Sequence, residues 1–327
     1  MNLTVILTLI ISAALTCAMT GVLIPILKKQ QMGQNIREEG PESHKSKAGT
    51  PSMGGIAIIL GTICASVIGA FLSKDGAGRD LFVIIAAFAA FGALGFLDDY
   101  LKVIKKENEG LKVKPKFAGQ LVISLLLAIY MTMLSEHQTN VMIPFYGQGI
   151  DFGVLYIPFI VFTMLAMVNA VNLTDGLDGL AAGTTGIVSV TLAIIAAVTV
   201  SVSSGIFLGA MAGACAGFLV FNKNPAKVFM GDTGSLALGG GLTVAAIVMK
   251  MELLLPIAGI IYVLEALSVC MQVGYFKATG GKRIFRMTPL HHHFELGGMH
   301  ERKVVAMFWT ITLIACLAVL GSMWRLF

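Results

Sequence analysis

Charged residues are scarce in this sequence: Asp, Glu, Lys and Arg make up 13% of its 327 residues, whereas 56% are apolar. Soluble domains usually carry roughly 25% charged residues, so this composition excludes a soluble enzyme and a disordered chain. Cysteine is also rare, and the composition excludes a secreted disulfide scaffold. The cysteines include no C-x-x-C pair, which argues against a metal or redox motif. We expect buried packing, not metal or redox chemistry, for the five cysteines. They are Cys17, Cys64, Cys215, Cys270 and Cys316.

The sequence also lacks internal repeats and low-complexity segments. Its first apolar run is not expected to be a cleaved signal peptide, because no basic residue precedes the run and no small-residue cleavage site precedes Lys28. The run is also too long for the apolar region of such a peptide.

Long apolar stretches dominate what is present. A helix that crosses a bilayer needs about 20 mostly apolar residues, and ten stretches meet that requirement. They are predicted at 3–27, 52–72, 81–97, 117–134, 155–171, 179–198, 205–221, 235–249, 253–276 and 304–324. Ten spans take up about 200 residues, which leaves no room for a separate soluble domain. We therefore expect an all-α polytopic membrane protein with a single integral membrane domain, 1–327.

The basic residues predict the orientation of these spans. Of the 23 Lys and Arg residues, 19 fall in alternate connections and only four in the others. Because positively charged loops stay in the cytoplasm, we expect five loops inside and both termini outside the cytoplasm. The net charge of +5 then reflects membrane topology and a phosphate-binding face, and it does not indicate nucleic-acid binding.

Five of the eight aspartates fall at the predicted cytoplasmic edge of the spans: Asp98, Asp99, Asp175, Asp178 and Asp232. A carboxylate between apolar helices is costly without a cation or hydrogen-bond donors. Carboxylates grouped beside many basic residues suit a hard cation and a phosphorylated substrate. The sequence therefore predicts a site of that kind on the cytoplasmic face.

Simpler interpretations stay open for several of these residues. Ser52 begins a predicted span, Asp178 and Asp232 precede one, and each of the three could be an ordinary helix cap. Asp98 and Asp99 could be a solvated, charge-paired helix end. Neighbouring residues on a helix diverge by about 100°, so we expect these two to differ in role, one facing the site and one bracing it or binding metal. Gly231 is expected to let the backbone approach a ligand.

Three consecutive histidines, 291–293, follow a basic stretch in the longest inner loop. They form a poor zinc site, because consecutive side chains do not readily point at one ion and no cysteine accompanies them. Hydrogen bonds to phosphate fit better, with one imidazole available for acid/base chemistry; an exposed loop motif is the alternative. Glu265 lies inside the ninth span, where an ionisable group is a functional candidate by default or a buried helix brace.

Five segments together resemble the polyprenyl-phosphate N-acetylhexosamine-1-phosphate transferases. They are P-S-M-G-G at 51–55, L-D-D-Y-L-K at 97–102, N-L-T-D-G-L-D-G-L at 172–180, M-G-D-T-G-S at 230–235 and P-L-H-H-H-F-E at 289–295. Ser52 stands where that family more often has Thr, and the hydroxyl is retained. The intact triple histidine favours the phospho-N-acetylmuramoyl-pentapeptide transferase branch over relatives that use UDP-GlcNAc.

The resemblance implies Mg²⁺-dependent transfer of phospho-MurNAc-pentapeptide from UDP-MurNAc-pentapeptide to undecaprenyl phosphate, which yields lipid I and UMP in peptidoglycan synthesis. It implies a multi-pass enzyme of the bacterial cytoplasmic (inner) membrane and a homodimer. Asp232 would bind the metal, and Asp98 and Asp99 would activate the lipid phosphate or help hold Mg²⁺. The remaining implied contacts divide by substrate part: the uridine diphosphate end for Lys102, Asn172, Asp175, Asp178, Asn222, Phe229 and Gln272, and phosphates or the sugar for Lys47, Ser52, His291, His292 and His293.

Two other functions compete with this one. A UDP-GlcNAc:polyprenyl-phosphate transferase belongs to the same class and differs in the sugar nucleotide. A cation-coupled transporter would also gather carboxylates in the membrane, but transporters place their ion sites near the bilayer midplane on broken helices. The predicted acids lie at one surface instead, which favours an enzyme over a transporter.

Overall fold

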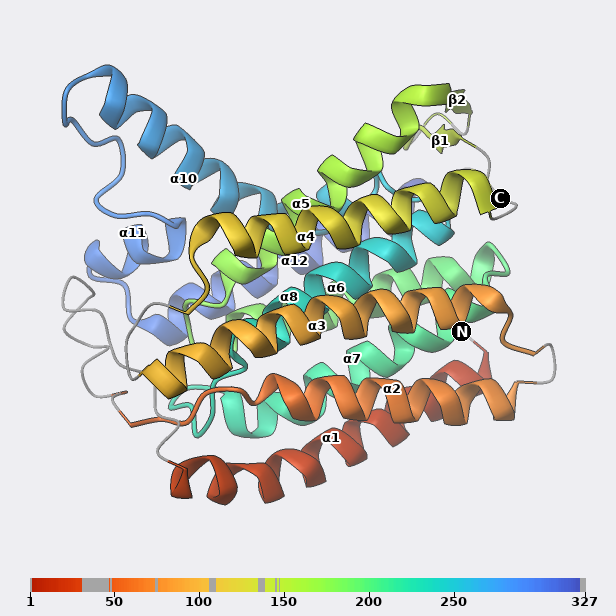
Figure 1. The fold of residues 1–327 in the computed structure, drawn as a ribbon, viewed down its shortest axis with the longest axis horizontal. Helices are drawn as coiled ribbons and strands as arrows, with labels where there is room; N and C mark the ends of the chain where they lie inside the picture. Colours follow the sequence, from red (N-terminus) through yellow and green to blue (C-terminus); the bar gives the residue numbers. More distant parts are fainter. Residues whose placement is uncertain are drawn as a thin grey trace.

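The computed structural model describes residues 2–30, 47, 49–73, 76–105, 110–134, 139–144, 146 and 148–323. Within them the chain is nearly all helical (Figure 1). The α-helices are α1 (Leu3–Lys29), α2 (Gly55–Leu72), α3 (Arg79–Lys105), α4 (Val113–Ile129), α5 (Tyr156–Thr174), α6 (Leu180–Val198), α7 (Val202–Asn222), α8 (Gly231–Val248), α9 (Leu255–Ala258), α10 (Ile260–Ala278), α11 (Leu290–Leu296) and α12 (Glu301–Met323). A π-helical turn, Tyr130–Leu134, continues α4, and a 3₁₀ turn, Gly153–Leu155, precedes α5.

Ten of these helices are long and apolar enough to cross a membrane, and they correspond to the ten predicted spans. Several boundaries differ from the prediction by a few residues, and three of these differences bear on the candidate site or its helices. The third span extends from Arg79 to Lys105, so its acids lie inside the helix and not after it. The eighth begins at Gly231, which places Asp232 in its first turn. The ninth is interrupted at Gly259, between α9 and α10.

The all-α prediction misses one short element. Strands β1 (Asn140–Met142) and β2 (Gly149–Asp151) form an antiparallel hairpin in which Val141 pairs with Ile150. Three-residue strands carry too little alternation to be recognised in sequence. The hairpin lies at the right-hand end of the bundle in Figure 1, together with the start of α1, whereas α11 lies at the opposite end.

Helix α8 is the centre of the bundle, and every residue from Thr233 to Val248 is buried. Glycines let its neighbours approach closely, because a side chain at Gly240 or Gly241 would overlap Phe91, Phe88 or Phe207. The glycine-rich face of α7 receives α1 in the same way, with Leu9 and Ala13 carbonyls lying against Gly213 and Gly217. Small residues at such crossings are typical of helix packing in membranes.

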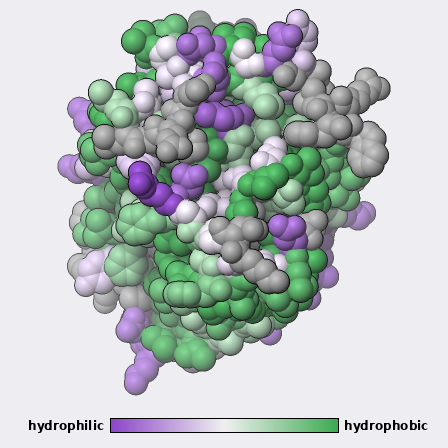
Figure 2. Space-filling model, turned by 90° about the vertical axis from the view of Figure 1, so that its right-hand side faces the viewer, coloured by the Kyte–Doolittle hydropathy of each residue, from purple (hydrophilic) through white to green (hydrophobic). Residues whose placement is uncertain are grey.

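The outer helices carry the large apolar side chains that stay exposed. On α4 and α5, for example, Leu126 and Phe162 are each more than half exposed. Viewed end-on from the hairpin side, hydrophobic side chains occupy much of the surface between small hydrophilic patches (Figure 2). A lipid-facing surface along the sides of the bundle accounts for the exposure of Leu126 and Phe162.

The prediction of buried packing is wrong for two of the five cysteines. Cys215 and Cys316 are buried, and Cys17 is half-buried, but Cys64 and Cys270 are exposed. Both exposed residues lie in candidate membrane spans, where an outward-facing small apolar side chain costs little in contact with lipid.

Some of the basic residues used to predict the orientation lie outside the described residues. This applies to Arg37, Lys45, Lys74, Lys106 and Arg325, and to Trp324 at the end of the tenth predicted span.

Candidate active site

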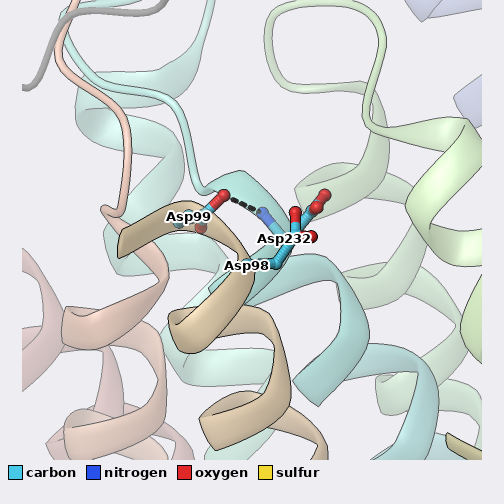
Figure 3. Close-up of side chains that lie close together, drawn as sticks. All are labelled: Asp98, Asp99 and Asp232. Atoms are coloured by element: carbon cyan, nitrogen blue, oxygen red, sulfur yellow. Dashed lines mark hydrogen bonds between the residues drawn. The ribbon is translucent and has the colours of Figure 1, made fainter. Parts of the chain in front are cut away.

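Three predicted carboxylates converge where the C-terminal part of α3 meets the start of α8. Asp98, Asp99 and Asp232 each offer an oxygen, and these oxygens all lie within 4.8 Å of one another. Asp98 and Asp99 are buried and Asp232 is partly buried. Figure 3 shows the carboxylates of Asp98 and Asp232 side by side, with Asp99 directed at the backbone nitrogen of Asp232.

The two neighbouring aspartates have different partners, as their divergence on the helix predicts. Asp99 Oδ2 accepts hydrogen bonds from the Thr233 backbone N–H at 2.9 Å and from the Thr233 hydroxyl at 2.7 Å. Its Oδ1 accepts from the backbone N–H of Asp232 at 3.2 Å. Asp99 thereby satisfies free N–H groups of the first turn of α8 from another helix.

Asp98 and Asp232 are instead joined by lysines. The Lys102 ammonium lies 2.6 Å from Asp98 Oδ2 and 2.8 Å from Asp232 Oδ2. Lys116, on α4, lies 2.7 Å from the same oxygen of Asp232. The sequence analysis did not select Lys116; its spacing of four residues from Gln120, a polar residue within an apolar stretch, was the available indication. We call Asp98, Asp99, Asp232, Lys102 and Lys116 the acidic centre.

Asn172 completes the acidic centre from α5. Its amide donates to Asp232 Oδ1 at 2.7 Å and to the Ser235 hydroxyl at 2.8 Å. Gly231, with φ of +70°, starts α8 in a conformation that favours glycine. A side chain at Gly231 would overlap Asp99 and lie 2.9 Å from the Ser52 hydroxyl, so Ser52 borders this centre.

A second group of contacts surrounds Lys47. Its ammonium lies 2.7 Å from Asp178 Oδ1 and 2.6 Å from Glu301 Oε1. Glu301 also accepts from the Asp178 backbone N–H at 2.8 Å and from the Asn224 amide at 2.7 Å. We call Lys47, Asp178, Asn224 and Glu301 the lysine cluster. The sequence analysis missed Glu301 and Asn224, because a single glutamate at a helix start is an ordinary feature of sequences.

Asn222 and Phe229 fix the loop beside the lysine cluster. The Asn222 side chain accepts from the Gly179 backbone N–H at 3.0 Å and donates to the Val228 carbonyl at 3.0 Å. Phe229, half-buried, exchanges backbone hydrogen bonds of 2.8 Å with Pro51 and Gly54 before α2. Both predicted residues therefore lie where the α5–α6, α7–α8 and pre-α2 segments meet.

Asp175 lies in the turn between α5 and α6 and is half-buried. Burial, followed by the nearby carboxylates of Asp232, Asp99 and Asp178, raises the pKa of Asp175 well above its usual range. The turn thus connects the acidic centre electrostatically with the lysine cluster.

The three histidines lie on a short helix, α11, and not in an open loop. They diverge as predicted. His291 Nδ1 lies 3.0 Å from Glu265, and His292 Nδ1 lies 3.1 Å from Glu295. His293 accepts from the Arg286 backbone N–H at 3.2 Å.

Gln272 is used by the loop before α11. Its carbonyl oxygen accepts from the backbone N–H groups of Ile284 and Phe285, at 2.9 and 3.0 Å, and its amide donates to the Phe285 carbonyl at 3.1 Å. In the structure Gln272 therefore positions this loop.

The capping alternatives are wrong. No side-chain cap is formed at the starts of α2, α6 or α8, whose N-cap residues are Gly54, Gly179 and Met230. Ser52 lies before Gly54, the N-cap residue of α2, and is too early in the chain to cap the helix. The carboxylate oxygens of Asp178 accept hydrogen bonds from Lys47, Asn224 and the Ala226 N–H.

The acidic centre suits a hard divalent cation. Carboxylate oxygens are the ligands that Mg²⁺ prefers, usually one or two of them together with substrate phosphates. Asp98 and Asp232 present oxygens to a shared position that Lys102 reaches in the structure. The lysines also leave positive charge for phosphate oxygens.

These features define a class of integral membrane proteins in which a polar site able to bind phosphate lies at one end of a helical bundle. A model described as glycosyl transferase family 4 matches residues 81–250, and a phospho-N-acetylmuramoyl-pentapeptide-transferase signature matches residues 47–59. The chain is 49% identical to the phospho-N-acetylmuramoyl-pentapeptide-transferase of Alkaliphilus metalliredigens, with 96% of each chain covered. Those of Halalkalibacterium halodurans and Listeria innocua are each 47% identical, with 97% and 90% of each chain covered.

The chain belongs to the phospho-N-acetylmuramoyl-pentapeptide-transferase family. It is a phosphoglycosyl transferase of peptidoglycan synthesis and a multi-pass protein of the bacterial cytoplasmic membrane. The family signature covers Lys47 and Ser52, and the broader family match covers the acidic centre.

Proposed function

We propose that the protein transfers phospho-MurNAc-pentapeptide from UDP-MurNAc-pentapeptide to undecaprenyl phosphate, giving lipid I and UMP, with Mg²⁺ as cofactor. The observation that carries this proposal is the pair Asp98 and Asp232, whose facing carboxylates share Lys102 at 2.6 and 2.8 Å. The pair lies at the end of membrane-crossing helices, where a lipid phosphate and a water-borne nucleotide can both arrive.

Asp232 and Asp98 would hold Mg²⁺ in this proposal, with Asp99 fixing the start of α8 behind them. When bound, the ion neutralises charge on the diphosphate and polarises its phosphorus–oxygen bonds. Lys102 and Lys116 would then move from the carboxylates to phosphate oxygens, which leaves each lysine with an anionic partner throughout. Electrostatic stabilisation of this kind supplies most of the rate in phosphoryl transfer.

The lipid phosphate needs little activation. A phosphate monoester has its second pKa near about 6, so it is mostly dianionic near neutral pH. Asp98 would accept the remaining proton, and Lys102 and Lys116 would keep the dianion beside the diphosphate. This assignment makes Asp98 the residue that activates the lipid phosphate and Asp99 the one that positions α8.

The lysine cluster would receive the uridine end of the nucleotide, together with Asn222 and Phe229. Lys47 is paired with two carboxylates, so its charge is already compensated and a neutral group fits there better than a phosphate. The histidines of α11 and Ser52 would border the sugar and its phosphate.

The uneven distribution of Lys and Arg supports a cytoplasmic position for this end of the bundle and an outside position for both termini. An even number of candidate spans, ten, supports termini on the same side. A homodimer remains part of the proposal on the basis of the family resemblance alone.

Purified protein with undecaprenyl phosphate and Mg²⁺ tests the proposal when it is offered each sugar nucleotide separately. We expect UMP and lipid I from UDP-MurNAc-pentapeptide and no release from UDP-GlcNAc. Release of UMP from UDP-GlcNAc alone would overturn the substrate assignment in favour of the GlcNAc-1-phosphate transferases. Family membership argues against a cation-coupled transporter, as does the position of the acids at one end of the bundle.

A further inference from the structure

Glu265 is a buried carboxylate inside a membrane-spanning helix, and His291 occupies both of its oxygens. The Glu265 side chain is 0% exposed and His291 is 1% exposed. Oε1 accepts from the His291 backbone N–H at 3.2 Å, and Oε2 lies 3.0 Å from ring atom Nδ1. Two contacts to one residue, one to its backbone and one to its ring, fix the orientation of the imidazole.

This arrangement selects one tautomer of His291. A carboxylate only accepts hydrogen bonds, so the hydrogen of the ring lies on Nδ1. The other nitrogen, Nε2, then carries a lone pair. A buried N–H without an acceptor would cost more than an unused lone pair, which favours the neutral ring with hydrogen on Nδ1 alone.

Nε2 is buried and has no hydrogen-bond partner within the described part of the chain. It lies directly against Gly176, where any side chain would overlap it. Gly176 follows Asp175 in the α5–α6 turn, and Asp178 of the lysine cluster ends the same turn. The one unused atom of the buried pair is therefore directed at the segment that connects the acidic centre with the lysine cluster.

A bracing role alone does not explain the charge of Glu265. Burying a carboxylate in a membrane span is costly, and a glutamine could also link α10 to α11 by hydrogen bonds. A carboxylate differs from an amide because it has two acceptor oxygens and no donor. Its hydrogen bond to the ring therefore requires a hydrogen on Nδ1. The analogous carboxylate in hydrolase triads fixes a histidine tautomer in the same way.

We propose that Glu265 is a positioning residue that holds His291 as the Nδ1–H tautomer, so that Nε2 accepts a hydrogen bond from a hydroxyl or amide N–H of the sugar nucleotide when nucleotide binding moves the Asp175–Gly176 turn away from Nε2. The inference rests on the proposed function for the identity of the ligand. It assigns His291 the role of a hydrogen-bond acceptor, in place of a donor to phosphate.

The Glu265→Gln substitution separates this role from bracing. Its amide oxygen would accept from the His291 backbone N–H, and its NH₂ group would donate to Nδ1, which moves the ring hydrogen to Nε2. Both hydrogen bonds survive, so we expect normal yield and a thermal midpoint lowered only by the N–H that Nε2 now buries without an acceptor. With Nε2 now a donor, we expect kcat for UMP release to fall about 100-fold and KM for the sugar nucleotide to change less than threefold.

Glu252→Gln is the matched control. Glu252 is also a buried glutamate, 1% exposed, and accepts a 2.7 Å hydrogen bond from the Tyr156 hydroxyl between α8 and α9. It lies in the connection at the other end of α8 from the acidic centre. Wild-type kcat in Glu252→Gln would show that the substitution type itself is harmless.

Nitrogen NMR of ¹⁵N-histidine-labelled protein provides a readout that needs no turnover. The chain has six histidines, so the His291 signals are identified as those that disappear in the His291→Gln variant. We expect wild-type Nε2 to be unprotonated at neutral pH, Nε2 of Glu265→Gln to be protonated, and the wild-type Nε2 shift to change when UDP-MurNAc-pentapeptide is added without lipid. Wild-type kcat in Glu265→Gln, or a protonated Nε2 in the wild type, would overturn the proposal.

The two measurements keep this inference separate from the proposed function. If the wild type releases no UMP from UDP-MurNAc-pentapeptide, the proposed substrate assignment is wrong. The NMR measurement of the His291 tautomer does not depend on that result. If Glu265→Gln does not fold, the wild-type spectrum decides.

Discussion

Asp99 on α3 and Thr233 on α8 are linked by two hydrogen bonds to one carboxylate oxygen, at 2.9 Å from the backbone N–H and 2.7 Å from the hydroxyl. The residue next to Asp99 in sequence, Asp98, has no such contact with α8 backbone; it faces Lys102 and accepts from the Leu111 N–H at 2.8 Å. Two adjacent acids thus divide into one that holds a helix start and one that faces the position of the chemistry.

This division predicts opposite effects of two matched substitutions. Asp99→Asn weakens a charged acceptor at a helix start and should destabilise the protein by about 1 kcal/mol, lowering the midpoint of thermal inactivation in detergent. Asp98→Asn should leave that midpoint nearly unchanged and reduce UMP release at least about 100-fold. Equal thermal and activity losses in the two variants would contradict the division.

The sequence predicted the ten spans well because each requires a long apolar run, which composition reveals directly. It also placed the five aspartates at one end of the bundle, as charge scarcity in a membrane demands. It did not distinguish Asp98 from Asp99, because helical spacing gives only their 100° divergence and not which partner helix lies on each side.

Mg²⁺ removal gives a second prediction. Chelation should abolish UMP release and added Mg²⁺ should restore it, because Asp98 and Asp232 present hard oxygen ligands. Asp232→Asn should lose activity at all Mg²⁺ concentrations, with at least an about 100-fold fall in kcat. The control is Asp151→Asn, an exposed aspartate of the hairpin, which should match the wild type over the same Mg²⁺ titration.

The crossing of α3 and α8 gives a third prediction. A side chain at Gly95 would overlap the carbonyl of Asp232, whereas at Gly274 on α10 it would meet no atom of the described residues within 4 Å. Gly95→Ala should therefore displace the start of α8 and lower both activity and thermal stability. Gly274→Ala, the same change in another helix, should lower neither, and equal behaviour of the two would exclude close packing as the cause.

Glu301 predicts a change in affinity without a change in chemistry. Its carboxylate holds Lys47 at 2.6 Å, the Asp178 N–H at 2.8 Å and the Asn224 amide at 2.7 Å. Glu301→Gln loses the charge and one acceptor, so we expect KM for the sugar nucleotide to rise about tenfold. The value of kcat should stay within twofold, because no contact of Glu301 involves the acidic centre; a fall in kcat at constant KM would contradict this.

Glu301, Asn224 and Lys116 also show where sequence reasoning ends. Each is an ordinary polar residue in its own segment, and each acquires meaning only from partners far away in sequence, such as Asp178 and Asp232. The sequence supplied the residue types of the site, whereas the contacts between α4, α5, α8 and α12 decide which of them meet.

The pH dependence of stability provides the last prediction, and it concerns Asp175. Burial and the carboxylates of Asp232, Asp99 and Asp178 raise the pKa of Asp175 above its ordinary value of 3.8. Between the unfolded and folded pKa values, the folded protein retains a proton that the unfolded chain has released, so raising the pH through that window lowers stability. Asp175→Asn removes the proton and should flatten the dependence. Thermal inactivation midpoints measured from pH 4 upward in chelator, so that bound metal does not contribute, test the sign. A wild-type midpoint that rises with pH in this window while Asp175→Asn stays flat would mean that the folded state lowers the pKa of Asp175.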